Sequence, residues 1–316
     1  MRNLLSPRFM LLLTALALVA FTSDPEAKKY TLQLNLEEGQ TYRLESTTDQ
    51  EINQVIMGME NVVEQTMGFT YAYDVTSASS EAYDISVTYD EILYRQSAQG
   101  MEVTYDSRDE ETDVPLQAQS FANLVGQSFE MTVTPAGSVT EVRGMDELIE
   151  AMIGEMDMPG VSADQIRQQL KTQFSDESMQ SSMEQTMAIY PDGPVKKGDS
   201  WTREMSISTV MTMQVVNTYT LDKVEGGKAY VSVEGTTSTG EEGNSTEMMG
   251  MSMTFNMEGT QSGSLVIDME TGMTITSTID QTITGDVSAT GGQMGSQTLE
   301  FPMSIDSKST VNLLED

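Results

Sequence analysis

Neither cysteine nor histidine occurs among the 316 residues of the chain, and 16 basic residues stand against 49 acidic ones. The chain therefore lacks disulfides, a thiolate nucleophile, the usual proton shuttle and the two commonest ligands of zinc. We predict that the protein is not an enzyme, that it carries no cofactor and that it has no metal site of the familiar kind.

The scarcity of positive charge also restricts the partners. The net charge of −33 opposes binding to nucleic acid, whose affinity comes largely from neutralisation of phosphates by Lys and Arg. We therefore expect no nucleic-acid partner. Like charges at this density repel one another and salt screens the repulsion, so the composition is typical of a protein from a salty habitat.

No apolar run is as long as the ~20 residues that a membrane-spanning helix needs. The longest lies from Phe9 to Phe21 behind Arg2 and Arg8, which is the pattern of a secretory signal. We expect residues 1–23 to be a cleaved signal peptide and the mature protein to be periplasmic or secreted, not an integral membrane protein. With no cysteine after the run, we expect no lipoprotein anchor.

Alternation of apolar and polar residues dominates the rest of the chain and predicts strands that are buried on one face. The apolar sets are Met67, Phe69, Tyr71, Tyr73 and Val75; Tyr83, Ile85, Val87 and Tyr89; Trp201, Met205, Ile207, Met211, Met213 and Val215; and Met273, Ile275, Ile279 and Ile283. The predicted fold is mainly β (α+β), with long curved antiparallel sheet or sheets. One sheet, a sandwich and two half-barrels all fit this pattern.

The strands form two similar groups. Gly39 aligns with Gly198, Tyr42 with Trp201, and the turn at Gly137 with the turn at Gly272. A repeat of this kind indicates a duplicated β unit. We predict a first β half at residues 24–143, a helical insert at 144–190 and a second β half at 191–316, combined in one globular unit.

Helical spacing replaces the alternation inside the insert. It predicts three short helices that pack on the sheet: one from Met145 to Met156, one that begins at Ser162 with a capping box to Gln165, and one with Ser175 as its N-cap. The apolar stripe of the last helix is Met179, Met183 and Met187.

One strand is unusually rich in methionine, a residue that occurs 26 times in the chain. Its alternate positions are Met249, Met251, Met253, Phe255 and Met257. Three interpretations apply: a packed core, the lining of an apolar pocket, and a site for copper(I), which prefers soft sulfur ligands. Because methionine is first a flexible apolar filler, we favour core or pocket over metal.

Three segments resemble a known family: "YTLQLNLEEGQTYRL", "YPDGPVKKGDSWT" and "GSLVIDMETG", in that order. They are similar to an uncharacterised family of exported proteins of Bacteroidota, the domain of unknown function numbered 6263. The resemblance extends from about Lys29 to Val311. It implies an exported, mostly β protein and supplies no catalytic or binding residues.

Two functions follow from these patterns. The first is an exported non-enzymatic protein that binds a lipid or another apolar small molecule in a Met-rich cavity. The second is a structural or interaction protein of the cell envelope with a solid core. The residues expected to line the apolar cavity are Met249, Met251, Met253, Phe255, Met257, Met179, Met183 and Trp201.

Overall fold

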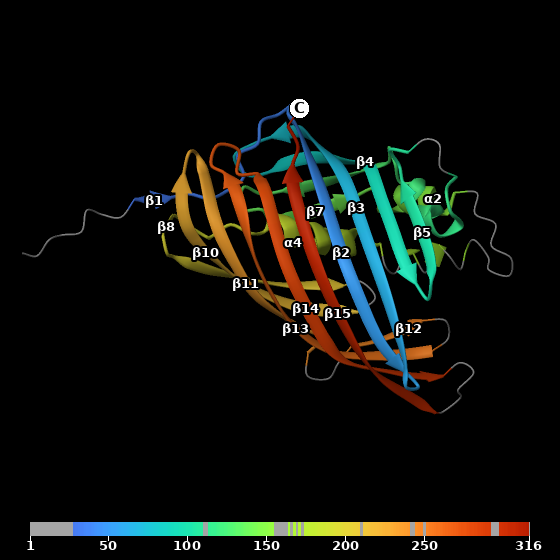
Figure 1. The fold of residues 1–316 in the computed structure, drawn as a ribbon. Helices are drawn as coiled ribbons and strands as arrows, with labels where there is room; N and C mark the ends of the chain where they lie inside the picture. The colour runs from blue at the N-terminus through green and yellow to red at the C-terminus, as the bar shows by residue number, and fades with distance from the viewer. Residues whose placement is uncertain are drawn as a thin grey trace, which may run out of the picture.

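A computed structural model describes residues 28–109, 113–154, 164, 167–168, 170–171, 174–208, 211–240, 244–248, 251–291 and 297–315. Figure 1 shows one large antiparallel sheet that curves around helices α2 and α4. The predicted fold, mainly β with long curved antiparallel strands and a helical insert, is confirmed.

The strands of the sheet fall into two runs along the chain. The first run contains β2 (Thr41–Ile56), β3 (Met59–Ala78), β4 (Tyr83–Ala98), β5 (Met101–Asp106), β6 (Ser128–Val133) and β7 (Val139–Arg143). The second contains β9 (Ser200–Ser208), β10 (Thr212–Glu225), β11 (Lys228–Ser238), β12 (Asn244–Met248), β13 (Met251–Asp268), β14 (Thr274–Gly291) and β15 (Thr298–Leu313). A separate two-stranded ribbon pairs β1 (Lys29–Tyr30) with β8 (Val195–Lys196).

The order across the sheet is β7-β6-β4-β3-β2-β15-β14-β13-β11-β10-β9, with β5 beside β4 and β12 beside β13. Each run is therefore contiguous, and the two runs meet where β2 pairs with β15. Of the three arrangements that the sequence left open, the structure has one continuous sheet. The boundaries predicted for the two halves and the insert stay a prediction.

Equivalent turns open the two runs. The N–H of Gly39 donates to the carbonyl of Val75 at 2.8 Å, and the N–H of Gly198 donates to the carbonyl of Leu221 at 2.7 Å. Each acceptor residue returns a bond from its own N–H to the residue that follows the glycine. Both glycines have positive φ, of 82° and 86°, which favours glycine over other residues. A repeated β unit would produce this correspondence.

The alternation predicted for strands is present, with one difference in length. The five apolar residues from Met67 to Val75 lie on one face of β3, opposite inward residues of β2 and β4. The segment from Trp201 to Val215, predicted as one strand, instead forms the hairpin of β9 and β10, in which Met205 pairs with Val215. Both arms keep their apolar residues on the same face because paired residues share a face.

The short helices are η1 (Leu116–Ala118), α1 (Gln119–Ala122), α2 (Met145–Ile153) and α4 (Asp176–Met187). The predicted stripe of α2 is buried at Met145, Leu148, Ile149, Met152 and Ile153. The predicted N-cap of α4 is confirmed, because the Ser175 side chain accepts a hydrogen bond from the N–H of Ser178. Ser162, Gln165 and Met156 lie outside the described residues.

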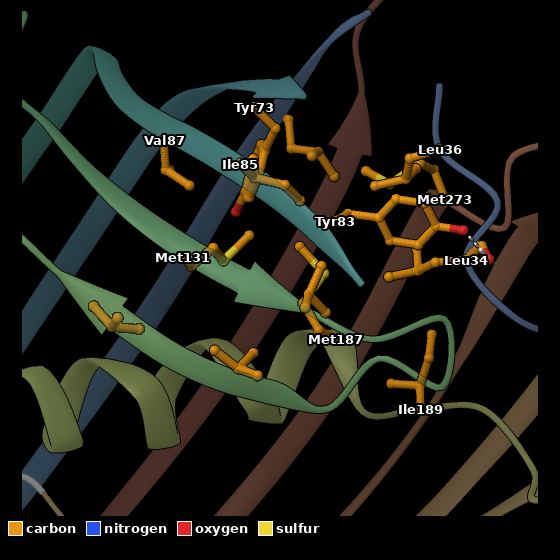
Figure 2. Packing of buried hydrophobic residues seen from close by; sticks show 14 of the residues in the cluster. Leu34, Leu36, Tyr73, Tyr83, Ile85, Val87, Met131, Met187, Ile189 and Met273 are labelled. Atoms are coloured by element: carbon orange, nitrogen blue, oxygen red, sulfur yellow. Dashed lines mark hydrogen bonds between the residues drawn. The ribbon is translucent and has the colours of Figure 1, made fainter. Parts of the chain in front are cut away.

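Helix α4 contacts β7 and β9, the two edge strands of the sheet. The Gln180 side chain donates to the carbonyl of Val139 on β7 at 2.7 Å. The main core lies between the sheet and the helices; in Figure 2, Met187 and Ile189 from the end of α4 pack among Met131, Tyr83 and Met273. We call the sheet face that bears this core the inner face.

Candidate ligand-binding site

The methionine-rich strand packs at the far end of the sheet. Phe255 and Met257 are buried, and Met251 and Met253 are half-buried. Met249 lies outside the described residues. Phe255 and Met257 form a second apolar cluster, away from α4, whose other buried members are Met213, Ile283, Val287 and Phe301.

The other predicted lining residues belong to the main core. Met179 and Met183 on α4 are half-buried against it. Trp201 on β9 stacks on Tyr219 with ring centroids 5.8 Å apart, and its indole N–H donates to the carbonyl of Ile189 at 2.8 Å. The structure thus divides the predicted set between two apolar clusters. Contact of these side chains with a ligand stays a prediction.

One cavity of the described part of the chain has a volume of about 1320 Å³. It adjoins a smaller cavity of about 290 Å³, and the two share Gln261, Gln281 and Ser307 in their walls. Met187 and Tyr190, which follow from α4, line the smaller cavity. The smaller cavity therefore lies on the inner face of the sheet. The larger one is lined by the residues on either side of Gln50 and Gln281, which are Asp49, Glu51, Asp280 and Thr282, so it lies on the outer face. None of the described residues predicted as lining belongs to either wall.

A row of amide side chains crosses the inner face of the sheet, and its members Asn217, Gln261 and Gln281 line the smaller cavity. Strand register places its members directly opposite one another, on the same face. In strand order from β4 to β10 the row is Gln96, Gln65, Gln50, Ser307, Gln281, Gln261, Gly235 and Asn217. We call this set the amide row.

One end of the amide row is a connected network. The Gln281 amide donates to Gln261 at 2.8 Å, Gln261 donates to Asn217 at 2.5 Å, and Asn217 donates to the Tyr219 hydroxyl at 3.4 Å. Gly235 lies between Gln261 and Asn217, and a Cβ atom there would stand 2.1 Å from Asn217 Oδ1. The absence of a side chain at Gly235 therefore makes room for the buried hydrogen bond.

The middle of the amide row is unbound. Within the described ranges, the side-chain amides of Gln50 and Gln65 have no hydrogen-bond partner, and both residues are half-buried. At the other end, the Tyr94 hydroxyl donates to Gln96 Oε1 at 3.0 Å. Because both residues are only half-buried, water can take up the hydrogen-bonding capacity of these amides.

Around the amide row, charged and uncharged side chains lie on opposite faces of the sheet. The amide row and the inner row on either side of it contain one charged residue in the described chain, Arg203. Its guanidinium donates to the carbonyl of Tyr190 and, at 2.8 Å, to Asp192. Alternation places the side chains that flank the amide row on the outer face, where they line the larger cavity; they include Asp49, Glu51, Glu64, Arg95, Asp280, Asp306 and Lys308.

The smaller cavity has a mixed wall. Hydroxyl groups line it on the central strands β2, β14 and β15, where Thr48 and Ser309 are hydrogen-bonded at 2.9 Å. Apolar side chains line it on the other sides; they are Leu44, Tyr73, Met187, Ile189, Leu265, Met273, Ile279 and Val311. The arrangement can hold an apolar group below the amide row.

Sequence reasoning missed the amide row, although its signal is present. Gln65 stands two residues before Met67, Gln96 two after Tyr94, and Gln281 two before Ile283. Each glutamine is thus in phase with the inward residues of its own strand. A polar residue at a position where the alternation predicts an inward apolar side chain indicates either a strained core or a hydrated inner surface. Here it indicates the cavity.

Two more features, metal ligation and membrane-spanning helices, concern the described residues alone. They contain no group of three or more Asp or Glu side chains placed to hold a metal ion. Nor does any helix in this part of the chain combine the length and the hydrophobicity that crossing a membrane requires.

Fold and cavity together define a mainly antiparallel β protein with a small cavity, lined by apolar, hydroxyl and amide side chains, on the inner face of a curved sheet. The chain belongs to the Family of unknown function (DUF6263), whose profile it matches over residues 80–274. The family resemblance seen in the sequence is thereby confirmed, whereas export and a source in Bacteroidota stay expectations. No curated protein matches the chain.

Solved structures with partial similarity include OccK5 (OpdH) of Pseudomonas aeruginosa, at 6% identity and a TM-score of 0.23, with 88% of this chain and 99% of that chain covered. OmpF of Salmonella typhi, in complex with daunomycin, has 7% identity and a TM-score of 0.24, with 88% and 99% covered. TM-scores this low carry no argument about fold or role.

Proposed function

We propose that this protein is an exported, non-enzymatic binding protein whose ligand is an amphipathic small molecule held on the inner face of the sheet. The observation that carries the proposal is the cavity of about 290 Å³ on the inner face, whose wall combines apolar side chains with the amides of Gln261 and Gln281. A volume of this order accommodates a small-molecule ligand.

The walls suit a molecule with two chemically different ends. An apolar group fits the smaller cavity, where Leu44, Leu265 and Val311 remove it from water. A polar group lies at the edge of the same cavity, against the side chains of Gln261, Gln281 and Ser307. The apolar end agrees with the lipid-like ligand predicted from the sequence, but it lies beside α4 and not along the methionine-rich strand.

The same walls argue for binding without catalysis. General acid–base catalysis needs a group whose pKa lies near the working pH, and nucleophilic catalysis needs an activated nucleophile. The inner rows offer amides, hydroxyls and apolar side chains, and the single guanidinium of Arg203 is already bonded to Tyr190 and Asp192. Such a wall can orient a ligand but supplies no group of these kinds.

Blocking the smaller cavity tests the proposal. Ser309→Phe projects a ring into it from the centre of the sheet, whereas Ser264→Phe on the exposed face of β13 is the matched control. With a dansyl-labelled fatty acid as probe, we expect the unmodified protein and the control to bind and Ser309→Phe to lose binding while remaining folded. Native mass spectrometry of protein from its own source should also find a bound amphipathic molecule. Absence of both signals would refute the proposal.

A further inference from the structure

The described residues that line the smaller cavity include no charged side chain, although the protein carries 49 acidic and 16 basic residues. Arg203, the inward cation of β9, lies outside this wall, and its guanidinium already donates to the carbonyl of Tyr190 and to Asp192. A charged group that entered the cavity would therefore lose its hydration without gaining a counter-ion, which is unfavourable. The wall favours a ligand whose polar group is uncharged.

Two side chains at the edge of this cavity can bind such a group. Gln281 on β14 and Ser307 on β15 lie directly opposite each other in the strand register, and both are half-buried. The Gln281 amide donates to Gln261 at 2.8 Å, so its carbonyl oxygen points away from Gln261 and accepts no hydrogen bond from the described residues. Within the same ranges, the Ser307 hydroxyl has no hydrogen-bond partner.

We propose that the polar group of the ligand is an uncharged hydroxyl, bound between the Gln281 carbonyl oxygen and the Ser307 hydroxyl. This inference rests on the proposed binding function and names the chemical class of the ligand, an aliphatic alcohol or glyceride. Because a hydroxyl group both donates and accepts, it donates to Gln281 Oε1 while it accepts from Ser307 Oγ. The apolar chain of the ligand then lies among Leu265, Ile279 and Val311.

Charged polar groups fit this position poorly. A carboxylate only accepts hydrogen bonds at neutral pH, so it has no donor for Gln281 Oε1. An ammonium group can donate to that oxygen, but it needs a nearby carboxylate to replace its hydration, and the described part of the wall contains none. The next two hydroxyls of the wall, those of Thr48 and Ser309, are already bonded to each other at 2.9 Å. An uncharged hydroxyl is thus the group whose hydrogen bonds the edge of the cavity completes.

The volume of the cavity limits the length of the apolar chain. About 290 Å³ holds about ten non-hydrogen atoms if each fills the ~30 Å³ of a water molecule in the liquid. A chain of about eight carbon atoms with one polar group matches this size. Octyl compounds are therefore suitable probes.

Competition at constant chain length tests the inference. The dansyl-labelled fatty acid is first bound to the folded protein, and 1-octanol, octanoate and octylammonium are then used to displace it at neutral pH. A further competitor, 1-octanoylglycerol, distinguishes a glyceride from a simple alcohol as the source of the hydroxyl. We expect 1-octanol or the glyceride to displace the probe at a concentration at least about tenfold lower than either charged compound does.

Ser307→Ala removes the proposed donor, and it separates a hydrogen bond from the general preference of an apolar wall for an uncharged compound. Because the Ser307 hydroxyl has no partner among the described residues, the melting temperature should stay unchanged, while the affinity for 1-octanol falls about fivefold. Ser307→Asp places a carboxylate at the same position and should make octylammonium the strongest competitor. Ser264→Ala, on the exposed face of β13, is the control and should bind as the unmodified protein does.

Either of two results would overturn the inference. One is that octanoate or octylammonium displaces the probe as well as the uncharged compounds do, and the other is that Ser307→Ala binds 1-octanol at full affinity. Failure of every octyl compound to displace a bound probe would also remove the hydroxyl but leave the proposed binding function standing. If the dansyl fatty acid does not bind and titration calorimetry finds no binding of 1-octanol, both proposals fall.

Discussion

Gly235→Ala is a substitution whose effect can be worked out from the amide row. The added Cβ atom would lie 2.1 Å from Asn217 Oδ1 and 3.0 Å from Gln261 Cγ. The first separation is not tolerated and the second requires a small shift of Gln261, so the Asn217 side chain must turn away from Gln261. The hydrogen bond between them, 2.5 Å long, would then break. Asn217 is 4% exposed and Gln261 is 8% exposed, so water cannot readily replace it.

The expected destabilisation is the difference between two terms. A buried polar group left without a partner costs about 1–3 kcal/mol. Alanine also restricts the unfolded chain more than glycine does, which stabilises the folded state by about 0.4–1 kcal/mol. We therefore expect the free energy of unfolding to fall by about 1–2 kcal/mol. Gly193→Ala has no heavy atom within 4 Å of its added Cβ and should not destabilise the protein.

Urea unfolding followed by circular dichroism measures both variants. A double-mutant cycle identifies the cause, because Asn217→Ala removes the same hydrogen bond and also the atom that the new Cβ would strike. The combined variant should then be less destabilised than the sum of the two single variants, by about 1 kcal/mol. Two results would show that Gly235 is not required for this hydrogen bond. One is that the destabilisations of the two single variants add fully in the combined variant. The other is that the Gly235→Ala protein is as stable as the Gly193→Ala control.

The remaining predictions concern pH, the methionine-rich strand and salt. Burial raises the pKa of Tyr89 to about 12 and raises the pKa of Tyr73 as well. The free energy of unfolding should therefore keep its full value below pH ~10 and decrease as the pH rises through the pKa values of the folded protein. Tyrosinate absorbance from these two residues in the folded protein near pH ~10 would contradict this. Met257→Asp should lower the free energy of unfolding by about 4 kcal/mol or more, because Met257 is 2% exposed. Asn256→Asp, on the exposed face, should change it by less than about 0.5 kcal/mol. Equal urea midpoints for the two variants would refute a packed cluster. Sodium chloride should raise the melting temperature because it screens the net charge of −33, and a melting temperature that is flat or falls from low to molar salt would count against adaptation to salt.

Much of the fold follows from side-chain period alone. In β3 the apolar residues recur at every second position, and burial of one face of a sheet requires that spacing. The hairpin between Ser208 and Thr212 escaped prediction for a physical reason. The residues between them are Thr209, Val210 and Met211, without the glycine, proline or asparagine that usually marks a turn, and two of the three are β-branched.

The site was less accessible to sequence reasoning because it depends on register. Gln96 and Asn217 stand at opposite ends of the amide row and are joined across it by β3, β2, β15, β14, β13 and β11. No local pattern reports that pairing. The methionine-rich strand attracted attention instead because its residues are adjacent in the chain. Its side chains at Phe255 and Met257 lie in the second apolar cluster, where methionine fills space.

The position of the smaller cavity depends on how the two runs of strands interlock. A Cβ atom on Gly137, in the turn between β6 and β7, would lie 1.9 Å from the carbonyl oxygen of Met187. A Cβ atom on Gly272, in the turn before β14, would lie 2.0 Å from the carbonyl oxygen of Gln33. Each turn thus abuts the segment that leads into the other run, and only glycine permits the approach.

The segment from Met187 to Tyr190 is consequently held from several sides. Besides the contact at Gly137, the Tyr190 hydroxyl donates to the carbonyl of Gly272 at 2.8 Å, and Trp201 donates to the carbonyl of Ile189 at 2.8 Å. The floor of the smaller cavity is therefore fixed by main-chain contacts, and opening it on that side would break all of them.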